Sequence, residues 1–211
     1  MPIPKKKVAA EAPIEIKASL GFKPLVAESN KFKPLKQIYS GYEIEKRWVI
    51  RTIETDYTTV KNSLHLYNEV LEKGTLVYQG YIKDIQVAKK MLREMGIIPA
   101  FKPNTIRLRR WGNKYILTLK DRKQVKKREV EWELDKKMFY KYWPLTKGAR
   151  VKKVRYIKVQ KGLEVTHDAF IDRFLLIIEI EVKTKEALDK LPTMGMDVTG
   201  ISSWANKNLA K

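Results

Sequence analysis

The sequence contains no cysteine, so disulfide bonds, a thiolate nucleophile and a thiolate metal site are all excluded. Histidine is also scarce, with only His65 and His167 in 211 residues, which argues against a histidine-rich zinc centre. No apolar run approaches the length that crosses a bilayer, and no hydrophobic signal segment follows the first methionine. These absences predict a cytoplasmic protein without membrane contact, whose chemistry relies on other residue types.

Acidic residues are outnumbered by basic ones, with 24 Asp and Glu against 44 Lys and Arg, for a net charge of +20. A field of this sign attracts polyanions such as nucleic acid, polyphosphate, nucleotides and acidic membranes. Net charge does not distinguish among these partners. The arrangement of the charges along the chain therefore carries the functional argument.

The first 38 residues differ from the rest because prolines and lysines interrupt any long element. Composition favours a loosely ordered extension, while its basic charge also allows an arm that grips RNA or another polyanion. We expect an N-terminal extension at 1–38 and one domain at 39–211.

The spacing of apolar and turn residues predicts a largely antiparallel strand protein with helices interspersed. We expect strands near 42–53, 75–83, 105–111, 114–120, 126–134, 151–159, 163–170 and 174–183. Helices are expected at 58–72, 84–95, 135–142 and 183–191, with a short last helix within 201–210. This order predicts an α+β fold or a barrel.

Several expected strands carry their charged residues on a single face. At 43–50, Glu43, Glu45 and Arg47 alternate with apolar residues that include Ile44 and Trp48. The same alternation recurs for Arg107 and Arg109, Thr118 and Lys120, Glu129 and Glu131, Lys153 and Arg155, and Glu179 and Glu181.

For a single strand, the simplest interpretation is a face exposed to solvent. When several strands share the pattern and pack their apolar faces outward against helices, their charged faces converge inside. A charged interior is costly unless a charged ligand balances it. Carboxylates suit a hard divalent cation, and Arg or Lys suits phosphate oxygens.

Taken in order, these residues resemble the motifs of the triphosphate tunnel metalloenzymes, also called the CYTH superfamily. Its E-x-E-x-K strand is matched by Glu43, Glu45 and Arg47, with arginine in the place of lysine. The later motifs are matched by Tyr78–Ile82, Arg107 and Arg109, Leu117–Lys120, Glu129–Glu131, Lys153–Tyr156, Asp168, Glu179–Glu181, Asp197–Gly200 and Asn206–Ala210. The resemblance covers about residues 42–210.

The resemblance implies a closed eight-stranded antiparallel β-barrel, or tunnel, with helices packed outside. It also implies a hydrolase that depends on Mg²⁺ or Mn²⁺ and acts on inorganic, nucleoside or other organic triphosphate. The implied metal ligands are Glu43, Glu45, Asp168, Glu179 and Glu181. The implied catalytic residues are Glu43, Glu45, Arg47, Glu129 and Glu131. The implied phosphate contacts are Arg47, Arg107, Arg109, Lys120, Lys153 and Arg155.

Two other functions stay open at this point. One is a non-hydrolytic binder of triphosphorylated nucleotides or RNA 5′ ends, which the net charge and Arg47 favour. The other is an adenylyl cyclase, an activity found in the same superfamily, although no adenine-reading motif is identifiable in the sequence. An RNA 5′-triphosphatase lies between the hydrolase and the binder.

Overall fold

The computed structural model describes residues 35–50, 57–121, 127–160, 163–191 and 194–210. The chain divides into two compact units, residues 1–31 and 32–211, and every described residue belongs to the second. Nearly all of the expected N-terminal extension therefore lies outside the described residues, and its boundary after residue 38 stays a prediction.

The strands of the described unit run in an antiparallel sheet. They are β1 (Gln37–Ile50), β2 (Thr75–Tyr81), β3 (Thr105–Trp111), β4 (Lys114–Asp121), β5 (Lys127–Leu134), β6 (Arg150–Gln160), β7 (Leu163–Phe170), β8 (Leu175–Val182) and β9 (Met196–Asp197). The helices are α1 (Tyr57–Lys73), α2 (Ile85–Glu94), α3 (Lys136–Tyr142), α4 (Lys185–Asp189) and α5 (Asn206–Leu209), with 3-10 turns η1 (Trp143–Thr146) and η2 (Ser202–Trp204). An α+β fold is confirmed.

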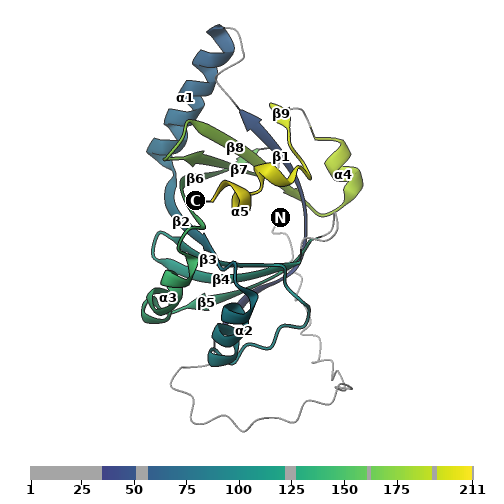
Figure 1. Ribbon diagram of the computed structural model, residues 1–211. Coiled ribbons are helices and arrows are strands. Elements are labelled where there is room, and N and C mark those ends of the chain that lie inside the picture. The colour runs from purple at the N-terminus through teal and green to yellow at the C-terminus, as the bar shows by residue number, and fades with distance from the viewer. Residues whose placement is uncertain (1–34, 51–56, 122–126, 161–162, 192–193, 211) are drawn as a thin grey trace, which may run out of the picture. The chain divides into compact units, whose positions relative to one another are not determined.

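The strands pair in the order β5-β4-β3-β2-β6-β7-β8-β1-β9. β1 is long enough to have two partners, because Ile44–Ile50 pairs with β8 while Gln37–Glu43 pairs with β5. The sheet curls strongly, so that β6–β8 and β3–β5 face each other across its concave side (Figure 1).

Two details differ from the sequence-based expectation. β1 begins at Gln37 rather than near 42, because its first half pairs with β5 through residues whose hydrophobicity does not alternate. β9, for which no strand was expected, is a two-residue strand, Met196–Asp197, which pairs with Trp48 and Val49. A strand this short leaves no periodic signal in a sequence.

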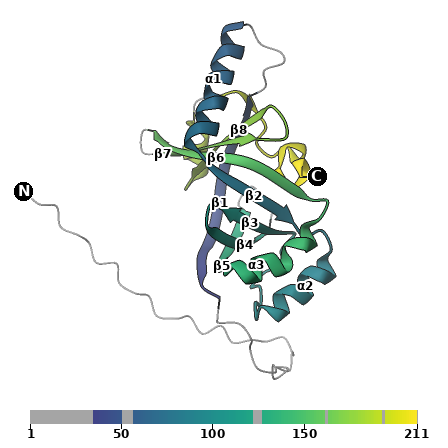
Figure 2. The same ribbon diagram turned by 90° about the vertical axis from the view of Figure 1, so that its left-hand side faces the viewer.

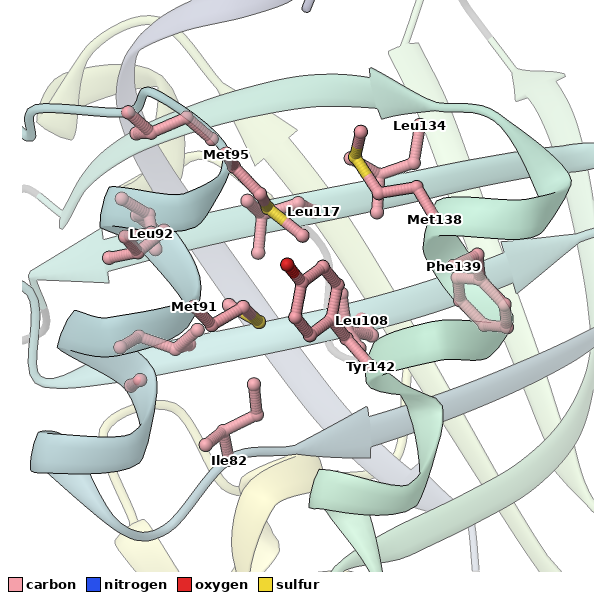
Figure 3. Close-up of a cluster of buried hydrophobic side chains, with 14 residues drawn as sticks. Ile82, Met91, Leu92, Met95, Leu108, Leu117, Leu134, Met138, Phe139 and Tyr142 are labelled. Atoms are coloured by element: carbon pink, nitrogen blue, oxygen red, sulfur yellow. The ribbon is translucent and has the colours of Figure 1, made fainter. Parts of the chain in front are cut away.

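The helices α1, α2 and α3 cover the convex face of the sheet. α2 and α3 pack on β3–β5, where Met91 and Phe139 meet Leu108 and Leu117 (Figure 3). α1 lies over β6 and β7, where Val70 packs with Val154 (Figure 2). The expectation that the apolar strand faces point outward against helices is therefore confirmed.

Local signals in the sequence set several of these elements. Asp84 caps the N-terminus of α2, because its Oδ1 accepts hydrogen bonds from the backbone N–H groups of Gln86 at 2.7 Å and Val87 at 3.1 Å. Gly112 turns β3 into β4 with a φ of 57°, a conformation that favours glycine. Within the described ranges, no helix is both long and apolar enough to cross a membrane.

Candidate functional site

A cavity of about 630 Å³ opens on the concave side of the curled sheet. Its lining is dominated by charged residues from β1, β3–β8 and the segment after β8. The acidic members are Glu45, Glu129, Glu131, Glu164, Glu179 and Glu181, and the basic members are Arg47, Arg107, Arg109, Lys120, Arg155 and Lys183. The alternating strand faces predicted from the sequence thus converge in one cavity.

One wall of the cavity is an ion cluster on β3, β4 and β5, which we call the β3–β5 cluster; it comprises Arg107, Arg109, Thr118, Lys120, Glu129 and Glu131. Strand register sets it, because Arg107 lies opposite Thr118, which lies opposite Glu131. Nη2 of Arg107 is 3.0 Å from Oε1 of Glu131 and 3.2 Å from Oε1 of Glu129. With Arg109 and Lys120 the cluster has three cations against two carboxylates, a net charge of +1.

The pKa values of the β3–β5 cluster reflect its crowding. Burial raises the pKa of Glu131, but the guanidinium groups of Arg109 and Arg107 outweigh it and bring the pKa to about 2. Burial and the neighbouring charge of Arg107 lower the pKa of Arg109 to about 10. Nε of Arg109 is also buried without a hydrogen-bond partner among the described residues. An anionic ligand in the cavity would therefore stabilise the positive charges of this wall.

The opposite wall holds a chain of alternating charges that crosses β1, β8, β6 and β7. Nη2 of Arg47 lies 3.1 Å from Oε1 of Glu45 and 2.6 Å from Oε1 of Glu179. Oε2 of Glu179 is 3.5 Å from Nη2 of Arg155, whose guanidinium donates to both oxygens of Asp168 at 2.7 and 2.6 Å. This wall also carries Glu181, which lies opposite Glu45 in the β1–β8 pairing.

The acidic members of this chain stay ionised in spite of burial. Burial raises the pKa of Glu179, but the charges of Arg47 and Arg155 outweigh it and hold the pKa well below its usual range. Burial lowers the pKa of Arg47, and the carboxylates of Glu179 and Glu45 more than reverse that effect, so its pKa is raised. Both partners are therefore charged at neutral pH.

The last pair of the chain, Lys153 and Asp168, differs from the expectation. Both side chains are fully buried, they form an ion pair, and neither is among the residues that line the cavity. Burial lowers the pKa of Lys153 to about 8 in spite of the attraction of Asp168. The structure therefore places this pair behind Arg155 rather than at the cavity surface. Their predicted contacts with phosphate and metal stay predictions.

The remaining sequence-predicted residues are placed as follows. Glu45, Arg47, Arg107, Arg109, Lys120, Glu129, Glu131, Arg155, Glu179 and Glu181 all line the cavity. The backbone of Glu43 lies on β1 opposite Lys127, but its side chain lies outside the described part of the chain. His65 is exposed on α1 and His167 is buried, and neither lines the cavity.

Several residues that line the cavity were not predicted from the alternation of charged residues in the sequence. Tyr39, Tyr42 and Trp111 add aromatic surface to the lining. Asn206, the first residue of α5, is 5% exposed, and its Oδ1 has no hydrogen-bond partner among the described residues. Of these, only Asn206 left a sequence signal, as the first residue of the matched Asn206–Ala210 motif.

The described carboxylates of the β1–β8 wall are of the type that binds a divalent cation, but their positions do not form a metal site. Glu45, Glu179 and Glu181 are hard oxygen donors on one side of the cavity. Among the side chains that the structure describes, however, no three acidic or histidine residues converge closely enough to hold a metal ion. The guanidinium of Arg47 instead bridges Glu45 and Glu179.

Comparisons with known proteins found the following similarities. No family model matches the chain. An inorganic triphosphatase from Nitrosomonas europaea is 33% identical over 111 residues, which cover 50% of this chain and 74% of that protein. A crystal structure of an inorganic triphosphatase is 26% identical with a TM-score of 0.48, covering 80% of this chain and 97% of that one. A Bacillus halodurans protein named as a candidate adenylate cyclase is 14% identical with a TM-score of 0.46, covering 71% and 85%.

Sequence identity carries the assignment, because 33% over 74% of the Nitrosomonas protein spans most of that chain. The ordered strand motifs quoted above come from the same part of the molecule as the charged cavity. The chain belongs to the triphosphate tunnel metalloenzyme (CYTH) superfamily.

Proposed function

We propose that this protein hydrolyses a terminal phosphoanhydride bond of a triphosphate bound in the charged cavity. The observation that carries the proposal is the asymmetry of the two walls. The β3–β5 cluster has a net charge of +1 and gathers Arg107, Arg109 and Lys120, while carboxylates dominate the wall formed by β1 and β8. A cavity of about 630 Å³ is within the usual size of a small-ligand site.

The fold proposal is that β1–β8 close into an eight-stranded tunnel around this cavity. Support comes from β1, whose two halves pair with β8 and with β5, the strand at the other end of the order. Closure removes the exposed edges of both end strands. It also keeps the ion pairs of both walls away from bulk water, where such pairs contribute little.

The β3–β5 cluster would bind the phosphate oxygens. Arg107 and Arg109 present planar guanidinium groups that match phosphate in two-point hydrogen bonding, and Lys120 adds a point charge. Arg155 from β6 and Arg47 from β1 approach from the other side of the cavity. Phosphoryl transfer depends mainly on such positioning and on neutralising the phosphate charge, so neither cysteine nor histidine is needed.

Glu131 would orient the attacking water. In the structure its Oε1 accepts hydrogen bonds from Arg107, Arg109 and the hydroxyl of Thr118, at 3.0, 3.0 and 2.7 Å. Its pKa of about 2 makes it a weak base in that state. When phosphate oxygens take up the two guanidinium groups, the main influence that depresses this pKa weakens. Substrate binding would therefore make Glu131 a better proton acceptor.

A divalent cation, Mg²⁺ or Mn²⁺, would be held by Glu45, Glu179 and Glu181, with Glu43 as a further candidate. When bound, such an ion neutralises phosphate charge and polarises the bond under attack. Asp168 and Lys153 would serve indirectly, because Asp168 accepts two hydrogen bonds from Arg155 and so sets the direction of that guanidinium. The chain's basic charge outside the cavity would draw polyanionic substrates, RNA among them, towards it.

One observation favours the non-hydrolytic binder as a second candidate. Arg47 replaces the lysine of the family motif, and its guanidinium contacts Glu45 and Glu179, two carboxylates of the proposed cation site. If the guanidinium stayed there when triphosphate bound, the cavity would hold its ligand without turnover. The same phosphate-release experiment separates the two functions.

The test is phosphate release from tripolyphosphate, ATP, GTP, thiamine triphosphate and RNA 5′-triphosphate, with Mg²⁺ or Mn²⁺. We expect release from at least one of these substrates, and its loss in Glu43→Ala and Arg107→Ala. Arg110→Ala is the matched control, because Arg110 follows on the same strand but lies over the Tyr78 ring and does not line the cavity. Tight tripolyphosphate binding without any release would reject hydrolysis in favour of the binder.

A further inference from the structure

Arg47 holds the position between carboxylates that a divalent cation would need. Its Nη2 is 3.1 Å from Glu45 and 2.6 Å from Glu179, and these acids come from adjacent strands, β1 and β8. All three side chains are largely withdrawn from solvent, with exposed fractions of 9% for Arg47, 15% for Glu45 and 14% for Glu179. One guanidinium nitrogen therefore bridges two partly buried carboxylates.

The surrounding charges show why a cation is needed here. Glu45 lies directly opposite Glu181 across the β1–β8 pairing, and like charges in that arrangement destabilise a sheet. Glu179 lies two residues before Glu181, on the same face of β8. Three carboxylates thus lie on this wall, and Arg47 supplies a positive charge that contacts two of them.

Apart from its contacts with the two carboxylates, the guanidinium of Arg47 is held weakly. Its Nε is buried and lacks a hydrogen-bond partner among the described residues, and its Nη1 makes only a long hydrogen bond of 3.3 Å to the carbonyl oxygen of Trp204. Its backbone is fixed, because its N–H donates to Oγ1 of Thr199 at 3.0 Å and its carbonyl accepts from Val198. Exchange of partners therefore requires movement of the side chain alone.

We propose that Arg47 is an internal counter-ion that competes with a divalent cation for Glu45 and Glu179. An anion that enters the cavity takes the guanidinium, and the two carboxylates become available to the metal ion. Metal alone therefore binds weakly, and metal and triphosphate strengthen each other's binding, as linkage requires of any such coupling. This proposal rests on the proposed function for the identity of the anion.

The competition predicts an effect that is measured without any substrate. Mn²⁺ is titrated into the full chain and free Mn²⁺ is followed by electron paramagnetic resonance, in parallel with calorimetry. Arg47→Gln removes the competing charge, so we expect Mn²⁺ to bind at least about tenfold more tightly than to the unsubstituted chain, a change of about 1.4 kcal/mol.

Lys46→Gln is the matched control. It removes the same charge one residue away, but Lys46 pairs with Asp197 at 3.7 Å and lies over the Trp48 ring rather than between Glu45 and Glu179. We expect its Mn²⁺ affinity to stay within about twofold of the original, because neighbouring residues of a strand point to opposite faces and Lys46 does not line the cavity. An equal gain in Lys46→Gln and Arg47→Gln would show a general field effect and overturn the competition.

Arg47→Lys guards against loss of folding in Arg47→Gln, which thermal unfolding detects. Lysine keeps the charge as a compact ammonium group and lacks the planar fork. We expect an intermediate Mn²⁺ affinity. If neither folded variant binds Mn²⁺ more tightly than the original chain, the proposal is rejected.

The outcomes also separate this proposal from the proposed function. Tighter Mn²⁺ binding by Arg47→Gln together with an original chain that releases no phosphate would keep the competition and reject hydrolysis. Phosphate release by the original chain with no gain in Mn²⁺ affinity in either Arg47 variant would keep hydrolysis and reject the competition.

Discussion

Glu131 links the stability of the site to pH. Its pKa is lowered from 4.5 to about 2, so its ion pairs contribute stability above pH 4.5 and lose that contribution as pH falls towards 2. The shift corresponds to about 3 kcal/mol at neutral pH. We expect Glu131→Gln to lower the free energy of unfolding at pH 7 and to weaken its dependence on pH between 5 and 2, since Gln does not titrate.

Urea unfolding at intervals of pH would measure this effect. Glu133→Gln is a suitable control, because Glu133 lies two residues along β5 but is exposed. Parallel pH profiles for Glu131→Gln and the original chain would contradict the assigned ion pairs.

The buried pair of Lys153 and Asp168 yields a second prediction. Asp168→Asn leaves the ammonium of Lys153 buried without its partner, and breaking such a pair costs about 3–5 kcal/mol. Lys153→Met should cost less, because Asp168 keeps two hydrogen bonds from Arg155. The double variant should cost clearly less than the sum of the single ones, since the two groups interact directly. Additive losses in urea unfolding would show that the pair is not coupled.

At the scale of the elements, Gly80 allows η1 to lie against β2. A Cβ atom at Gly80 would approach the Cβ and Oγ1 of Thr146 to 2.5 Å. Thr146 has little freedom to yield, because its hydroxyl donates to the carbonyl of Trp143 and accepts from Nε of Arg150. We expect Gly80→Ala to destabilise the protein by about 1–3 kcal/mol through overpacking.

Thermal and urea unfolding would check the effect of Gly80→Ala. Thr75→Ala, at the exposed first position of the same strand, serves as the control with a small expected effect. A Gly80→Ala variant as stable as the control would mean that η1 does not press against β2 as described.

Most strands and their inward faces follow from the sequence, because side chains alternate with a period of two. That period placed Arg107 and Arg109 on one face and Leu108 on the other, as the structure shows. The period gives no information about the register between strands that are distant in the sequence. The contact between Arg47 and Glu179, and the burial of Lys153 with Asp168, depend on that register. The first half of β1 was missed because pairing with β5, rather than local propensity, makes it a strand.

At the scale of the whole molecule, the cavity does not account for the net charge. Among the described residues, its lining has six acidic and six basic side chains, so the +20 of the chain lies elsewhere. Residues 1–34 contribute seven Lys and three Glu, a net charge of 7 − 3 = +4. This distribution favours a polyanion contact outside the cavity, separate from the proposed site of hydrolysis.

Deletion of residues 1–34 tests that separation and leaves β1 complete, since β1 begins at Gln37. We expect weaker binding of single-stranded RNA and a shallower dependence of that binding on salt, because fewer phosphate contacts release fewer counterions. Release of phosphate from tripolyphosphate should be unchanged. Fluorescence anisotropy over a range of salt concentrations would measure the binding, and identical salt slopes would exclude a role for the segment.

Hydrolysis of a triphosphate in the charged cavity is tested most directly by ³¹P nuclear magnetic resonance of tripolyphosphate incubated with the protein and Mg²⁺ or Mn²⁺. We expect orthophosphate and pyrophosphate to appear in equal amounts. Arg107→Ala should be slowed by roughly 100-fold or more, as is typical when one donor to the reacting group is lost. Arg110→Ala should match the original chain. An unchanged tripolyphosphate spectrum with either ion, at protein concentrations that bind the ligand, would contradict hydrolysis.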